Sequence, residues 1–118
     1  GIAATDGANI LINPDKFFDF SLPERTFIAA HECVHNVFGD VELLHRCKAS
    51  KVVPMHDGTS LPFDNLTMQK AMDIRINALL KSSKIGKPPK DGHYDDKFTG
   101  QESVLDIYQK TYKKKPDG

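Results

Sequence analysis

The feature that most constrains this chain is the segment His31-Glu32-Cys33-Val34-His35, which has the pattern H-E-x-x-H. In an α-helix, residues four apart lie on one face, one turn from each other. Two imidazoles at that spacing can bind one zinc ion from the same side, and Glu32 then lies where it can take a proton from a water activated by the metal. The segment therefore predicts a zinc site with His31 and His35 as ligands and Glu32 as the general base.

The residues around this segment have the pattern of a partly buried helix. Ser21-Leu22-Pro23-Glu24 is a capping box, in which the first and last side chains each accept from the other residue's backbone N–H. Apolar residues follow at spacings of three and four, at positions 27, 30, 34 and 37. We expect a helix over about residues 22–38, with Cys33 facing the core as a small hydrophobic residue. The alternative interpretation is an amphipathic helix with two solvated histidines.

The N-terminal segment has the pattern of a β-hairpin. Asp6-Gly7, a dipeptide typical of tight turns, separates the short apolar run 2–5 from the extended run 9–13. Pro14 is expected to end the second strand. The strand Ile10-Leu11-Ile12 is a candidate for binding an extended peptide by edge pairing.

A second helix is expected over about residues 66–82. Asp64 or Asn65 can cap its N-terminus. Asp73 and Asn77 are four residues apart and therefore share one face of this helix.

A third helix is expected to begin at a second capping box, Thr99-Gly100-Gln101-Glu102, and to end near Tyr112. The segment 51–62, which contains two prolines and a glycine, is expected to be irregular. These elements predict an α+β fold class with an N-terminal hairpin and three main helices. A length of 118 residues predicts one domain over 1–118.

Composition gives no reason to expect nucleic acid or a membrane as a partner. Lysine plus arginine and aspartate plus glutamate each number 16, so the formal net charge is zero, and we interpret Lys113-Lys114-Lys115 as a solvated tail. No apolar run approaches the ~20 residues that span a bilayer. Two cysteines do not form a disulfide framework, so the cytoplasm is the default expectation. The sequence does not indicate an oligomeric state.

A catalytic zinc site needs a third protein ligand beside the two histidines. Asp73 is favoured because a carboxylate from a second helix can complete such a site. Its alternative role is a solvent-facing residue or an ion pair with Arg46 or Arg75. Three histidines stay open as other candidates for the third ligand: His45, His56 and His93.

A hydrolase of this kind also needs a donor that stabilises the oxyanion. Four residues are candidates, and the sequence does not choose among them: Tyr94, His93, His45 and Arg46.

Several segments together resemble a family of metallopeptidase domains that precede von Willebrand factor A-like domains in bacteria and stand alone in phage proteins. The resemblance follows the chain in order through these residues: Ala3-Ala4-Thr5-Asp6-Gly7, Asn13-Pro14, Ala30 to His35, His45-Arg46, Ala71 to Asn77, Pro89, Tyr94-Asp95, and Glu102 through Ile107-Tyr108. It implies a zincin-like fold, zinc-dependent hydrolysis of peptide bonds, and Asp73 as the third ligand.

The chain departs from the family pattern in three places. The block Ala71 to Asn77 has a tighter spacing than the Ala-x-x-Asp-x-x-Ile-Asn block of the family. Family members commonly have Gly-His soon after H-E-x-x-H, whereas Gly39 is followed here by Asp40, and His45-Arg46 comes later. Either an insertion has moved the His-Arg pair, or Asp40 replaces the histidine. The family also has a helix and a strand ahead of the Ala3–Gly7 segment, so the resemblance implies that these elements are missing here. With no von Willebrand domain following, it points to the stand-alone, phage-like form.

Three functional hypotheses follow from the sequence. The first is a zinc peptidase that acts on peptides or proteins, with Glu32 as the base. The second is a zinc-stabilised binding or inhibitory module that does not cut. The third is a metal-free helical domain whose histidines have no joint role.

Overall fold

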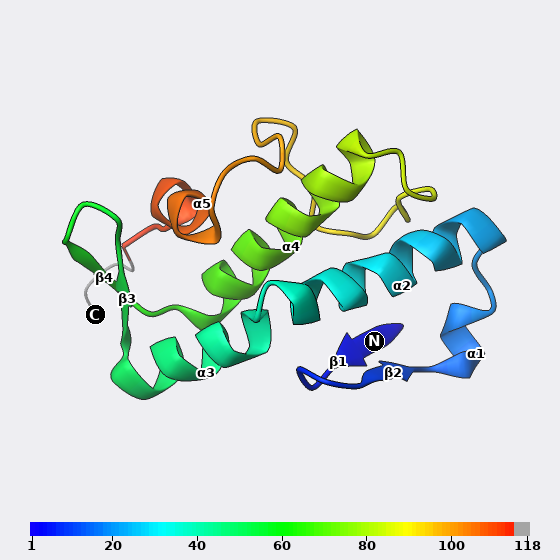
Figure 1. The fold of residues 1–118 in the computed structure, drawn as a ribbon, viewed down its shortest axis with the longest axis horizontal. Coiled ribbons are helices and arrows are strands. Elements are labelled where there is room, and N and C mark those ends of the chain that lie inside the picture. Colours follow the sequence, from blue (N-terminus) through cyan, green and yellow to red (C-terminus); the bar gives the residue numbers. More distant parts are fainter. Residues whose placement is uncertain (115–118) are drawn as a thin grey trace.

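The computed structural model describes residues 1–114 (Figure 1). Within that range the chain forms an α+β domain of five helices and two antiparallel hairpins. In chain order the elements are β1 (Ala3–Thr5), β2 (Ile10–Ile12), α1 (Pro14–Phe17), α2 (Leu22–Val37), α3 (Asp40–Ser50), β3 (Val52–Pro54), β4 (Ser60–Pro62), α4 (Asn65–Ser82) and α5 (Val104–Thr111).

The expected N-terminal hairpin is confirmed. β1 and β2 pair with Ala4 opposite Leu11, and the Asp6 carboxylate accepts from the backbone N–H of Ala8 and Asn9 in the turn. Figure 1 shows β1 between β2 and α2. The hairpin therefore lies alongside the helix that carries H-E-x-x-H.

The helix over 22–38 is also confirmed, with both hydrogen bonds of the capping box between Ser21 and Glu24 present. α2 ends where Gly39 adopts a left-handed conformation, with φ of 67°. Glycine adopts this conformation at little cost. The chain turns sharply there, and the segment after Gly39, which had no predicted structure, forms α3.

The prediction that 51–62 is irregular is wrong, because this segment contains the hairpin β3–β4. Asp57 accepts from the N–H of Thr59 and Gly58 has a φ of 86°, so a tight turn joins the strands. Prolines 54 and 62 lie at strand ends, where a missing N–H is tolerated.

The third helix begins later than its predicted capping box. Glu102 accepts from the N–H of Thr99, but the Thr99 hydroxyl accepts from Gln101, and Gly100 has a non-helical φ of 91°. Gly100 also lies so close to the Leu79 backbone that a Cβ there would be 2.7 Å from the Leu79 nitrogen. The segment is therefore a turn packed on α4, and Ser103 caps α5 instead.

The helix expected over 66–82 is confirmed as α4, capped by Asp64. Its first half packs against α3, β3–β4 and α5 in the larger apolar cluster, which includes Met68, Val53 and Tyr108. Its second half packs on α2 in a smaller cluster built on Phe27, Ile76 and Leu80. α4 thus connects the main core to the face of α2 that carries the histidines.

Two further expectations concern single residues. Cys33 does not face the core: its side chain is exposed, because α2 turns Phe27, Ile28 and Glu32 inward instead. Lys113 and Lys114 are exposed as expected, and Lys115 lies outside the described residues. Within residues 1–114, no helix combines the length and the apolar character needed to cross a membrane.

Candidate metal centre

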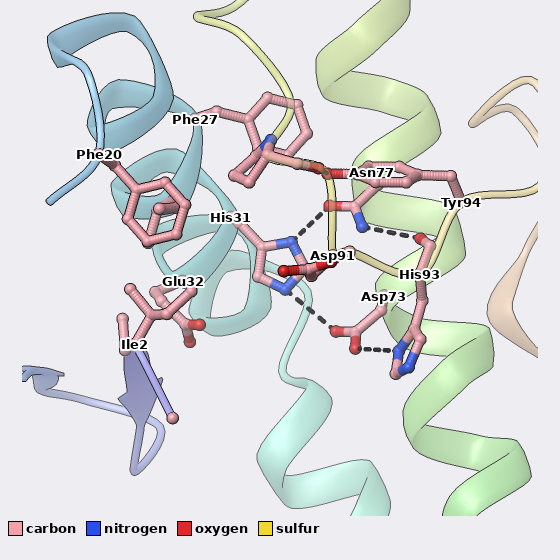
Figure 2. Close-up of a pocket in the computed structure, with 15 residues that line it drawn as sticks. Ile2, Phe20, Phe27, His31, Glu32, Asp73, Asn77, Asp91, His93 and Tyr94 are labelled. Carbon is pink, nitrogen blue, oxygen red and sulfur yellow. Dashed lines mark hydrogen bonds and ion pairs between the residues drawn. The ribbon is translucent and has the colours of Figure 1, made fainter. Parts of the chain in front are cut away.

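Three side chains from α2 and α4 converge on one point. His31 Nε2, His35 Nε2 and one carboxylate oxygen of Asp73 lie 2.9–3.1 Å from one another. The two histidines lie one turn apart on α2, and the packing of α2 on α4 brings Asp73 opposite them (Figure 2 shows His31 and Asp73). This group of three residues could hold a metal ion.

Hydrogen bonds on the far side of each ring determine which nitrogen faces that point. His31 Nδ1 lies 2.7 Å from the side-chain oxygen of Asn77, and His35 Nδ1 lies 2.9 Å from a carboxylate oxygen of Asp40. These oxygens accept, so each Nδ1 must carry the proton. In the neutral rings both Nε2 atoms therefore present lone pairs to the carboxylate oxygen of Asp73.

Asn77 is itself held in one orientation. Its amide nitrogen donates to the backbone carbonyl of His93 at 2.8 Å, which leaves its oxygen for His31 (Figure 2). Asn77 is nearly fully buried, so both bonds lie away from solvent. This arrangement is the usual support of a metal-binding histidine, whose other ring nitrogen donates to a fixed acceptor.

Asp40 supports His35 in the same way and is also buried. It reaches His35 because Gly39 turns the chain back between α2 and α3. Burial by itself would lower the pKa of His35, but hydrogen bonds to Asp40 and Asp73 raise that pKa to about 9. Without a metal, a proton on His35 can thus occupy the convergence point.

Asp73 stays ionised at this position. Burial acts to raise its pKa, but hydrogen bonds with the rings of His31, His35 and His93 hold the pKa well below its usual range. Its second oxygen lies 3.0 Å from His93 Nδ1. Asp73 does not pair with Arg75, whose guanidinium lies over the Phe38 ring at 3.8 Å.

Glu32 lies between two cavities that flank the cluster. It is only 9% exposed, and burial raises the pKa of its carboxyl group. Together with Asp73 it lines both a cavity of about 380 Å³ beside His31 and one of about 250 Å³ beside His35. A carboxylate with a raised pKa, close to a group that could hold a metal ion, suits a proton acceptor.

Of the other candidates named from the sequence, His93 contacts the cluster, Tyr94 lines a cavity beside it, and the rest lie elsewhere. His45 and Arg46 line a separate cavity with Asp6 and Gly7. His56 contacts the Ser103 hydroxyl. Tyr94 lines the larger cavity with its ring, but its hydroxyl donates to the Pro89 carbonyl. His93 is thus the one of these three histidines that contacts Asp73.

Sequence reasoning gave no role to Asn77, and it considered Asp40 only as a replacement for the histidine that follows H-E-x-x-H in the family. A role for Asn77 could have been inferred from its position, because it lies four residues after Asp73 on the same face of the helix. Asp40 had a weaker signal, because its contact with His35 depends on the left-handed turn at Gly39. No family model matches the chain, and no curated protein or solved structure matches it either.

Proposed function

We propose that this protein is a zinc-dependent peptidase in which His31, His35 and Asp73 hold the metal and Glu32 is the general base. One observation carries the proposal: three acceptor atoms face one another at about 3 Å with both supporting N–H groups turned away. With neutral rings such an arrangement repels itself, and either a metal ion among the atoms or a proton on a ring nitrogen relieves the repulsion.

The donor set and its dimensions suit zinc. Two imidazole nitrogens and one carboxylate oxygen form a known catalytic zinc set. Bonds of about 2.0–2.1 Å in a tetrahedral arrangement place the ligand atoms roughly 3.3 Å apart. The observed 2.9–3.1 Å needs an expansion of only a few tenths of an ångström. Bound there, zinc supplies Lewis acidity and lowers the pKa of water toward neutrality.

The chain's own residues would move the proton and orient the ligands. Glu32 accepts a proton on its carboxylate and delivers it to the leaving amine. Asn77 and Asp40 are positioning residues, since they hold His31 and His35 with Nε2 toward the cluster. His93 is the candidate oxyanion donor that lies beside Asp73.

The edge of β1 that faces away from β2, on the side of α2, suits an extended peptide. Ladder hydrogen bonds alternate along an antiparallel pair, and those at Ile2 and Asp6 point to β2. The backbone groups of Ala3 and Thr5 therefore point away from β2. Residues 2–5 line the two cavities that flank Glu32, whereas β2 lines neither. β1, rather than the strand 10–12 expected from the sequence, is thus the edge beside the cluster.

Metal content and proteolysis test the proposal together. Wild-type protein should contain one zinc per chain by elemental analysis and should cleave an unfolded protein such as reduced casein. Glu32→Gln should keep the zinc and lose at least a hundredfold in rate. Glu42→Gln, an exposed glutamate on α3, is the matched control and should change neither. Full activity in Glu32→Gln would refute the assignment of the base.

A second candidate is a zinc-stabilised binding or inhibitory module that does not cut. It is favoured by the position of Tyr94, whose hydroxyl is bonded to Pro89, and of His45, which lies in another cavity. His93 is then the candidate oxyanion donor beside Asp73. Its Nδ1 already contacts the Asp73 carboxylate, so this nitrogen is not available to an oxyanion. Zinc-dependent stability without turnover on any unfolded substrate would establish this alternative.

A further inference from the structure

The cavity of about 380 Å³ beside His31 has a mainly apolar wall. The apolar residues that line it come from the N-terminal segment, α2 and the loop after α4: Ile2, Phe20, Phe27, Ile28, Pro89 and Tyr94. Figure 2 shows Ile2 and Phe20 on the opposite side of His31 from Asp73. The volume is within the range of ligand pockets, and an apolar wall next to polar groups is their usual composition.

The direction of β1 decides which part of a bound peptide reaches this cavity. Ile2 lines the cavity together with Ile28, whereas the Thr5 hydroxyl lies 2.7 Å from the side-chain oxygen of Asn36. β1 therefore runs alongside α2 in the same direction (Figure 1). A peptide paired antiparallel to β1, the more stable pairing, runs the opposite way. Its C-terminal part then lies beside the apolar cavity.

We propose that the cavity beside His31 binds the side chain immediately C-terminal to the cleaved bond and selects a large apolar residue such as leucine, methionine or phenylalanine. This inference rests on the proposed peptidase function. Phe20 is the specificity-determining residue, because it is the aromatic residue of the cavity wall that belongs to neither apolar core cluster. Asp91, which also lines the cavity, disfavours an acidic side chain there.

Cleavage of a peptide mixture tests this choice of substrate. Zinc-loaded protein is incubated with a proteome-derived peptide library, and the new termini are identified by mass spectrometry. Large apolar residues should be enriched after the cut, and acidic ones depleted. Phe20→Ala should lower the rate on phenylalanine and leucine peptides roughly tenfold, as expected for loss of apolar contact in a pocket.

Phe18→Ala is the matched control, since Phe18 is 64% exposed and does not line the cavity. It should leave the preference and the rate unchanged. Cleavage without an apolar preference would overturn the inference while the peptidase function stands. An apolar preference on the N-terminal side of the cut would also overturn it, because the peptide would then run parallel to β1.

A binding measurement separates this inference from catalysis. The zinc-loaded protein is titrated with N-acetyl-phenylalanine amide and with N-acetyl-aspartic acid amide while backbone amide NMR shifts are followed. The phenylalanine probe should shift the amides of Phe20, Ile28 and Tyr94, and Phe20→Ala should weaken this response severalfold. Such shifts without any cleavage would refute the peptidase function but keep the apolar selectivity. Equal responses to both probes, or no response, would overturn the inference.

Discussion

The two regions that α4 joins satisfy their polar groups in opposite ways. In the main core, the buried Tyr108 hydroxyl accepts from the N–H of Asp64 at 2.8 Å and donates to the Pro62 carbonyl at 2.6 Å. Donor and acceptor are matched there by the protein itself. Between α2 and α4, by contrast, Nε2 of His31, Nε2 of His35 and one carboxylate oxygen of Asp73 face one another, and a donor lies among them only when a ring takes a second proton.

The two regions use different parts of the same helix, α4. The first half of α4 contributes Met68, Ala71 and Met72 to the apolar core, which is complete without a ligand. The next turns contribute Asp73 to the group that could hold a metal ion, and Asn77 to the support of His31 in that group. The core region should therefore determine the free energy of unfolding, and the cluster should determine the response to metal and pH.

The largest expected effect comes from a cavity in the core. Met68 is fully buried, and Met68→Ala should lower the free energy of unfolding by about 2–5 kcal/mol. Urea denaturation measures this loss. Zinc affinity of the folded fraction should stay at the wild-type value, because Met68 does not contact the cluster. A parallel loss of zinc affinity would show that the two regions are not separate.

Removal of the metal should expose a pH dependence that belongs to the cluster. The pKa of His35 is raised from 6.5 to about 9 in the folded protein, so its contribution is fully present below pH 6.5 and is lost as pH rises through 9. Urea denaturation in EDTA should show stability falling by at most about 3 kcal/mol over this window. The depressed pKa of Asp73 makes stability fall as well when pH drops below about 4.

Two comparisons test whether His35 causes this pH dependence of stability. Asp40→Asn removes one of the carboxylates that raise the pKa of His35, so the loss between pH 6.5 and 9 should become smaller. Zinc-loaded protein should instead gain stability as pH rises toward 7, because its ligands must be deprotonated. A metal-free protein whose stability is constant from pH 6.5 to 9 would contradict the assignment.

Loss of one supporting hydrogen bond should have a smaller effect that is confined to the cluster. Asp40→Asn keeps the size of a buried side chain but weakens the acceptor for His35 Nδ1. Zinc affinity, measured by competition with a chelating dye, should fall about 10–100-fold. Asp57→Asn, in the exposed β3–β4 turn, is the control and should leave the affinity unchanged.

The smallest expected effects come from the helix caps. Ser21→Ala and Ser103→Ala each remove the side-chain acceptor at a helix N-terminus and should cost about 1 kcal/mol. Thermal unfolding of zinc-loaded protein measures both. Neither residue contacts the cluster, so zinc affinity should not change. A lower zinc affinity in Ser21→Ala alone would show that the start of α2 contributes to the site.

The predictions from sequence succeeded where a signal was local. The capping box at Ser21, the Asp6-Gly7 turn and the cap at Asp64 each concern hydrogen bonds within a few residues, and all three elements form as expected. The helix predicted to begin at Thr99 does not form there, because Gly100 packs against Leu79, a residue distant in the sequence, in a turn with a positive φ. The prediction that Cys33 is buried was wrong, because the apolar pattern of a helix does not define which part of the protein each of its faces contacts.

The sequence by itself determined that two histidines and a glutamate share one helix, because the spacing of four residues acts within a single turn. Only the tertiary structure decided that Asp73 faces them while His45 and His56 lie elsewhere. That choice depends on the packing of α2 on α4, which joins residues about forty positions apart in the chain. Local spacing carries no information about such a contact, because apolar packing between helices sets it.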